Sequence, residues 1–416
     1  MKKFRPSESK REKLSRHKRK LVALAFYLSA FITAGIIGCS TKNENPSFAH
    51  APSLPSYQQS TYQDYVDETQ QWLAEHRVYK TDEHDLEVAL NSPFEVVPED
   101  PNGEAVLLVH GLGDSPYSFR DIANHLAKQG YLVRAILLPG HGSKVGDLIL
   151  PSYEDWHGVV EHHTALLLEE YPSIWLGGYS TGANLVTSKA LLDDRISGLL
   201  LFSPAFKPTS NAVKYASFAS VFVQWADKDP EDNMLRYNSL PMNGAAVYYE
   251  TVSDVQTQLD KYRFDKPTVM VLSEGDSVVD TKAAVDWFNS HFSNPNNKLV
   301  WQGDNAPQAS GAIAQTMRLP EFRVSNGSHM GMLFSPENPY YGTEGSVRIC
   351  DNGQAEEAYM ACLNGEPMWY SSYGYQEPGK IHARLTFNPY FDQMSEIIDS
   401  VMNGERHYEQ TASAKK

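Results

Sequence analysis

The segment GGYSTGA at residues 177–183 places Ser180 among small residues, directly after the apolar run Ile174-Trp175-Leu176. The spacing G-x-S-x-G arises by chance in about one chain in ten of this length, so its surroundings must decide its meaning. An apolar strand pattern precedes the serine and a helical pattern over 182–192 follows it. A serine on such a strand-to-helix turn is exposed as a nucleophile requires, and the first helical amides point at its oxygen.

The chain around this segment alternates between strand and helix patterns. Continuous apolar runs predict buried strands, and amphipathic stretches predict helices between them. The predicted strands lie at 105–110, 131–138, 173–178, 196–202 and 268–273, and the helices at 119–129, 153–171, 182–192 and 390–402. This alternation predicts an α/β fold with a mostly parallel, doubly wound sheet covered by helices on both faces.

Insertions interrupt this alternation. Residues 204–265 carry many aromatic side chains without strand alternation, which predicts a cap over the site and is equally compatible with a helical subdomain that has its own core. Two further insertions, roughly 305–320 and 336–384, flank the segment around residue 329. We expect a folded domain over 61–404 and a disordered tail over 405–416.

A serine hydroxyl needs a base and an orienting acid, which in this architecture follow in the order Ser, acid, His. Asp276 lies in the turn SEGDSVVD just past a predicted strand, whereas Asp280 is better placed as the N-cap of the next helix. His329 lies in the glycine-containing turn NGSHMG, whereas His291 ends a helix. The sequence therefore predicts that Ser180, His329 and Asp276 converge.

An oxyanion formed at this serine would need two amide donors. The segment His110-Gly111-Leu112-Gly113 follows a predicted strand, where the oxyanion loop of this architecture lies. We therefore predict that the backbone N–H groups of Leu112 and Thr181 are the donors.

Several motifs in order resemble the α/β-hydrolase family, in particular its bacterial carboxylesterase, monoacylglycerol lipase and lysophospholipase-like branch. They are HGLGDSPYSF, GYLVRAILLPGHG, DLILPSYEDW, GGYSTGA, SEGDSVV and SHMG, and the resemblance covers most of 105–335. It implies that Ser180 is the nucleophile, His329 the base and Asp276 the orienting acid, with His141 supporting the oxyanion loop. The sequence departs from the family in the turn Ser-Glu-Gly-Asp and in its insertions around His329.

The N-terminus has the organisation of an export signal. Ten Lys and Arg in the first twenty residues precede an uncharged stretch over 21–38 that ends in Ile-Ile-Gly-Cys. This ending resembles a lipobox, which implies a lipoprotein signal peptide over 1–38, acylation of Cys39 and, with Ser40 following, sorting to the outer membrane of a bacterial cell envelope. An uncleaved membrane anchor is the alternative. Residues 39–60 are rich in Ser, Pro and Asn, which predicts a flexible tether.

The remaining cysteines are Cys350 and Cys362. Export leads to an oxidising compartment, so we predict a disulfide between them, and two free buried thiols are the alternative.

The formal net charge of −15 makes nucleic acid an unfavourable partner. We expect no metal site, because the adjacent His162 and His163 diverge by about 100° on a helix. The chemistry requires no cofactor, and the oligomeric state stays open.

The combined expectation is a serine carboxylic-ester hydrolase that forms an acyl-enzyme and acts on acyl-glycerol or lysophospholipid-type esters at a membrane. One alternative is an exported serine peptidase, for which acidic cap residues could bind a free amine: Asp227, Asp229, Glu231 and Asp232. The other is a catalytically inactive surface-binding lipoprotein.

Overall fold

The computed structural model describes residues 45–413 of the 416-residue chain, with side chains described through residue 404. The chain divides into two units, Met1–Asn45 and Pro46–Lys416, and the elements given below lie in the second. The predicted signal peptide over 1–38 and the acylation site at Cys39 fall outside the described residues. None of the described helices has both the length and the apolar character that crossing a membrane would need.

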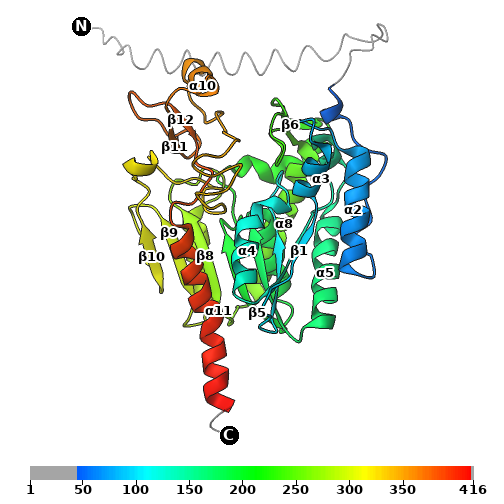
Figure 1. The fold of residues 1–416 in the computed structure, drawn as a ribbon, viewed down its shortest axis with the longest axis vertical. Coiled ribbons are helices and arrows are strands. Elements are labelled where there is room, and N and C mark those ends of the chain that lie inside the picture. The colour runs from blue at the N-terminus through cyan, green and yellow to red at the C-terminus, as the bar shows by residue number, and fades with distance from the viewer. Residues whose placement is uncertain (1–44, 414–416) are drawn as a thin grey trace, which may run out of the picture. The chain divides into compact units, whose positions relative to one another are not determined.

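Within the described chain, a central sheet of eight strands has the order β1-β3-β2-β4-β5-β8-β9-β10 (Figure 1). β1 pairs antiparallel with β3, and the other neighbours pair in parallel. The strands are β1 (Phe94–Val96), β2 (Ala105–Val109), β3 (Leu132–Ile136), β4 (Ile174–Tyr179), β5 (Ile196–Phe202), β8 (Thr268–Ser273), β9 (Lys298–Gln302) and β10 (Ala312–Gln315). This sheet with its covering helices is the predicted α/β-hydrolase fold.

Strand β2 shows how the sheet separates two apolar cores. Leu107 and Val109 belong to one buried cluster, whereas Val106 and Leu108 belong to the other. Both faces of the strand are therefore buried, which explains its continuous apolar sequence.

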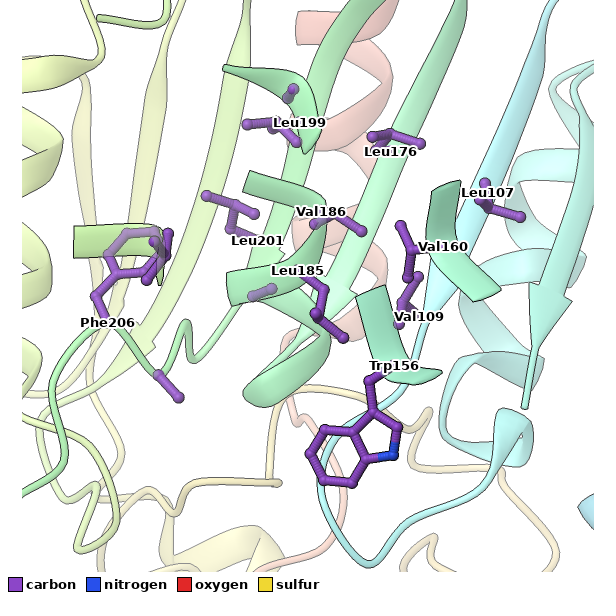
Figure 2. Packing of buried hydrophobic residues seen from close by; sticks show 14 of the residues in the cluster. Leu107, Val109, Trp156, Val160, Leu176, Leu185, Val186, Leu199, Leu201 and Phe206 are labelled. Atoms are coloured by element: carbon purple, nitrogen blue, oxygen red, sulfur yellow. The ribbon is translucent and has the colours of Figure 1, made fainter. Parts of the chain in front are cut away.

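The first core lies under the larger helices. It receives side chains from α2 (Tyr62–His76), α5 (Tyr153–Glu170), α6 (Thr181–Ala190), α8 (Met242–Lys261) and α9 (Thr281–His291). Figure 2 shows Trp156 and Val160 of α5 and Leu185 and Val186 of α6 in this core, with Leu176 of β4 among its labelled strand residues. Burial of such side chains supplies most of the stabilisation of helices in this layer.

The second core covers the opposite face of the sheet. It receives side chains from the 3₁₀ turn η2 (Pro116–Phe119), from α4 (Arg120–Lys128) and from α11 (Phe391–Ser413). The sequence predicts that the domain ends at residue 404 and that a disordered tail follows over 405–416. The helical backbone of α11 instead extends to Ser413. The remaining short elements of the main body are η1 (Pro46–Phe48), α3 (His84–Asn91), η3 (Val145–Ile149) and η5 (Pro320–Phe322).

The cap segment 204–265 divides into two parts. Its first part contains η4 (Asn211–Tyr215), α7 (Ala216–Ser220) and an antiparallel pair, β6 (Trp225–Asp227) with β7 (Leu240–Pro241), which the sequence analysis did not predict. Its second part is α8, which packs mainly into the first core, while Ala245 and Ala246 near its start form a small cluster with Ala216 of α7. The cap therefore shares the core of the main body through α8 and has a small apolar cluster of its own.

Residues 46–60 differ from the predicted tether because they pack on the body of their unit. The buried amide of Ala51 donates to Asp147 Oδ1 at 2.5 Å. The ring of Phe48 lies edge-on against Trp225, with the ring centroids 4.9 Å apart. A segment held by a buried hydrogen bond and an aromatic contact is not a free linker.

The insertion 336–384 contains α10 (Glu356–Leu363) and a parallel strand pair, β11 (Trp369–Ser371) with β12 (His382–Arg384). A disulfide joins Cys350 to Cys362, and both cysteines are buried with Met368 and Ala383. Figure 1 shows this insertion and the cap strand β6 at the same end of the sheet.

Candidate active site

The turn between β4 and α6 holds Ser180 in a strained conformation. Its φ of 53° and ψ of −113° lie in a region that residues other than glycine rarely adopt. The flanking glycines make this turn possible, because a Cβ on Gly182 would lie 1.9 Å from the carbonyl oxygen of Val109. A Cβ on Gly178 would likewise lie 2.5 Å from the amide of Ala183. The G-x-S-x-G spacing is therefore required by packing.

The structure brings Ser180, His329 and Asp276 together in one line of hydrogen bonds. His329 Nε2 lies 3.0 Å from Ser180 Oγ, and His329 Nδ1 lies 2.6 Å from Asp276 Oδ2. Because a carboxylate only accepts, Nδ1 carries the proton and Nε2 is free to accept the proton of the serine hydroxyl. The Asp276 side chain is fully buried and that of His329 is 13% exposed, so this line is largely shielded from water.

Backbone contacts fix the acid and the histidine. Asp276 Oδ1 accepts from the amides of Val278 and Val279 at 2.8 and 3.0 Å, which orients the other oxygen toward His329. The two loops approach closely, since a Cβ on Gly275 would lie 2.5 Å from the carbonyl oxygen of Gly327. This contact accounts for the glycine before the acid.

Hydrogen bonds from other segments also hold the loop that carries His329. Ser328 Oγ donates to the carbonyl of Leu385 at 2.5 Å and accepts from the amide of Gly331 at 3.0 Å. Ser203 Oγ donates to the carbonyl of His329 at 3.1 Å. The residues that follow β12 therefore help to hold the histidine loop in place.

The alternative candidates for the acid and the base, Asp280 and His291, have other roles. Asp280 caps α9, where its carboxylate accepts from the amide of Ala283 at 3.0 Å and pairs with Lys207 at 2.8 Å. His291 is the last residue of α9 and contacts Ser290 Oγ at 2.8 Å.

The predicted oxyanion donors lie beside the serine. Leu112 and Thr181 line the same cavity as Ser180, and neither amide donates a hydrogen bond within the described chain. The adjacent amide of Gly113 donates to His141 Nε2 at 3.0 Å. Burial lowers the pKa of His141 to about 4, so it is a neutral acceptor that holds the loop near pH 7.

A cavity of about 340 Å³ lies over Ser180. Much of its wall is apolar, and the cap supplies part of that wall: Val213, Leu240, Ala245 and Tyr248. The Tyr248 hydroxyl is shielded from solvent and has no partner within the described chain, so it can bond to a bound molecule.

Besides His329, three residues with acidic or basic side chains line this cavity: Asp114, Arg236 and Arg384. Burial raises the pKa of Asp114 to about 6, and the nearby Arg236 and His329 act in the opposite direction. The sequence analysis missed these groups and Tyr248, because each lies alone in its segment and no local motif marks it.

The acidic cap residues that could serve a peptidase lie elsewhere. Asp227, Asp229 and Asp232 line a neighbouring cavity of about 690 Å³, not the one over Ser180. The carboxylate of Glu231 accepts hydrogen bonds from the backbone amides of Asn238 and Ser239.

Within residues 45–404, no group of three or more His, Cys, Asp or Glu side chains could hold a metal ion. His162 Nε2 contacts the carbonyl of Gln59 at 2.8 Å. His163 is buried against the rings of Tyr62 and Tyr65, where burial lowers its pKa to about 3.

Comparison with known proteins shows that this chain is similar to hydrolases of the esterase and lipase type. A family model described as serine aminopeptidase, S33, matches residues 100–228. A carboxylesterase of Bacillus subtilis (strain 168) is 26% identical over 205 residues, which cover 48% of this chain and 82% of that protein. A thermostable monoacylglycerol lipase of Bacillus sp. (strain H-257) is 27% identical over 186 residues, covering 42% and 71%. The solved monoacylglycerol lipase of Paleococcus ferrophilus superposes with a TM-score of 0.41 at 17% identity, covering 50% of this chain and 88% of that one.

We expect Asp276→Asn to lower kcat by about four orders of magnitude, because an amide there leaves the histidine in the wrong tautomer. Steady-state hydrolysis of p-nitrophenyl butyrate measures the effect. Asp280→Asn is the matched control: it should keep its activity, and at most lose about 1 kcal/mol of stability with the helix cap. Equal activity losses in both variants would contradict the placement of the acid at Asp276.

Proposed function

We propose that this chain, a serine hydrolase of the esterase and lipase type, cleaves carboxylic esters through Ser180, His329 and Asp276. The observation that carries the proposal is the line of hydrogen bonds from Asp276 through His329 to Ser180, beside two free amides in an apolar cavity. No other group of side chains is needed for the reaction.

The reaction begins when Ser180 Oγ attacks the ester carbonyl while His329 Nε2 takes its proton. The amides of Leu112 and Thr181 bind the resulting oxyanion, and losing one such donor costs roughly 3 kcal/mol in the barrier. His329 then gives its proton to the leaving alcohol, which departs and leaves an acyl-enzyme. Water activated by the same histidine releases the carboxylic acid and restores the serine.

Acyl-glycerol or lysophospholipid-type esters fit the cavity best. Transfer of an acyl chain from water to an apolar wall lowers the free energy of binding by about 25 cal/mol per Å² of apolar surface buried. The cap supplies such a wall. The similarity to a monoacylglycerol lipase supports the same substrate class.

The cap also presents exposed apolar side chains next to the cavity. Five large apolar residues in the span 215–223 are exposed, close in sequence to Val213 in the cavity wall: Tyr215, Phe218, Val221, Phe222 and Val223. A group of exposed apolar side chains on a protein surface marks an interaction site. Here we assign it to contact with the lipid surface that contains the substrate.

The peptidase alternative is less well supported. A free amine needs a carboxylate close to the scissile bond, but the one carboxylate among the described residues lining the cavity over Ser180, Asp114, lies near the positive charge of Arg236. The acidic cap residues line the neighbouring cavity instead. An inactive binding protein would have no need of the strained Ser180 turn.

We expect Ser180→Ala to abolish hydrolysis of p-nitrophenyl butyrate and of monoacylglycerol, because no nucleophile remains. Activity is measured beside circular dichroism, which should match the wild type. Full activity in this variant would refute the proposal, and wild-type cleavage of aminoacyl amides without ester cleavage would favour the peptidase.

We expect the double variant Phe218→Ser/Phe222→Ser to lose roughly tenfold or more of its rate on aggregated monoacylglycerol, because the side chains are 72% and 73% exposed and would contact the lipid surface. The soluble ester p-nitrophenyl acetate serves as the reference substrate. The outcome against a lipid-contacting role is an equal loss on both substrates, or no loss on the aggregated one.

We also propose that acylation of Cys39 tethers the enzyme to a bacterial outer membrane, on the basis of the lipobox-like Ile-Ile-Gly-Cys. Cys39→Ser should release the protein from the membrane fraction and remove incorporated palmitate. Continued integral association of this variant would favour the uncleaved anchor.

A further inference from the structure

Two arginines form a wall shared by the cavity over Ser180 and the neighbouring cavity of about 690 Å³. Among the described residues, Arg236 and Arg384 are the lining residues that both cavities have in common. Arg236 lies on the cap between β6 and β7, and Arg384 ends β12 of the disulfide-containing insertion. The two segments that distinguish this chain from a minimal hydrolase thus each contribute one guanidinium.

Neither guanidinium has a carboxylate partner within salt-bridge distance in the described chain. Arg236 Nη1 contacts Met330 Sδ at 3.5 Å, while its Nε is shielded from solvent and has no acceptor. Arg384 Nε donates to Asn352 Oδ1 at 2.8 Å and its Nη2 to the carbonyl of Asp351 at 2.9 Å. Both side chains are therefore held by neutral partners, and carboxylates such as Asp114 and Asp351 act on them only from beyond ion-pair distance.

A partly buried guanidinium without a carboxylate at ion-pair distance is stabilised by a ligand that brings negative charge to it. Burial and the neighbouring Arg236 lower the pKa of Arg384 to about 10, which reflects two positive charges close together. The facing carboxylate is Asp114, and its ionisation is itself opposed by burial. Among the described residues that line the cavity over Ser180, one carboxylate thus faces two guanidinium groups, whereas Asp351, which also acts on Arg384, lines the larger cavity.

We propose that Arg236 and Arg384 bind an anionic group, a phosphodiester or carboxylate, on the alcohol part of the ester that Ser180 cleaves. This inference rests on the proposed function and refines its substrate class. With the acyl chain against the apolar wall, the alcohol part extends past the arginines toward the larger cavity. Guanidinium groups suit oxyanions, because their N–H groups match two oxygens at once.

The larger cavity favours an anion that arrives attached to the substrate over a free one. Its lining includes carboxylates that repel small anions, among them Asp227, Asp229 and Asp351. A group tethered to an already bound acyl chain reaches the arginines at a high effective concentration and overcomes this repulsion.

The test compares two soluble esters with the same acyl chain, 1-octanoylglycerol and 1-octanoyl-glycerophosphoglycerol. We expect Arg236→Gln to lower the ratio of kcat/KM for the phosphodiester over that for the neutral ester by about 10- to 100-fold, because a charge-assisted hydrogen bond is lost. Arg236→Lys should recover part of the ratio. Arg263→Gln is the matched control: Arg263 is exposed and is not among the residues that line either cavity, so the ratio should not change.

An unchanged ratio in Arg236→Gln, or a parallel fall on both esters, would overturn the inference while leaving ester hydrolysis by Ser180 in place. A wild-type protein that cleaves neither ester would instead overturn the proposed function. Inorganic phosphate added to the neutral-ester assay tests whether the arginines bind a free anion or only one attached to the substrate. Inhibition that Arg236→Gln removes would mean that the pair takes a free anion, against the tethered group proposed here.

Discussion

The hydrogen bond between His329 Nε2 and Ser180 Oγ is the interaction on which the rest of the site depends. It exists because the β4–α6 turn holds Ser180 in a strained conformation that only small neighbours permit. Strain of this size persists only where the surroundings enforce it. Here the enforcement comes from β4, fully buried in the middle of the sheet, and from α6, packed against it.

The same site shows how insertions can add recognition without changing the chemistry. The sheet supplies the nucleophile, the acid and the oxyanion loop from the carboxyl ends of parallel strands, where such folds bind their ligands. The cap and the disulfide-containing insertion supply the apolar wall and the two arginines. Leu385, directly after the insertion, accepts a hydrogen bond from Ser328 beside the histidine, so the end of the insertion lies next to both the recognition and the positioning contacts.

Much of this arrangement could be predicted from sequence because its signals are local. A serine between glycines, an acid after a strand and a histidine in a glycine turn each carry their own context. Asp280 could be set aside for the same reason, since an N-cap position is visible in the sequence. The pairing of Cys350 with Cys362 was predicted because export left two cysteines on one short segment.

What could not be predicted depends on contacts distant in sequence. Strands β1, β9 and β10 were missed because short or mixed runs become strands only beside a partner. The packing of residues 46–60 depends on Asp147, about a hundred positions away, and on Trp225. Arg236 and Arg384 meet only because the cap and the insertion fold over the same end of the sheet (Figure 1).

The account stands on Ser180 being the one activated serine of the chain. Labelling with a fluorophosphonate, followed by mass spectrometry of the proteolytic peptides, tests this directly. The account predicts one stoichiometric adduct on Ser180, formed far more slowly in Asp276→Asn because the histidine then lacks its orienting acid. An intact protein that takes up no label, or takes it up on another serine, would contradict it.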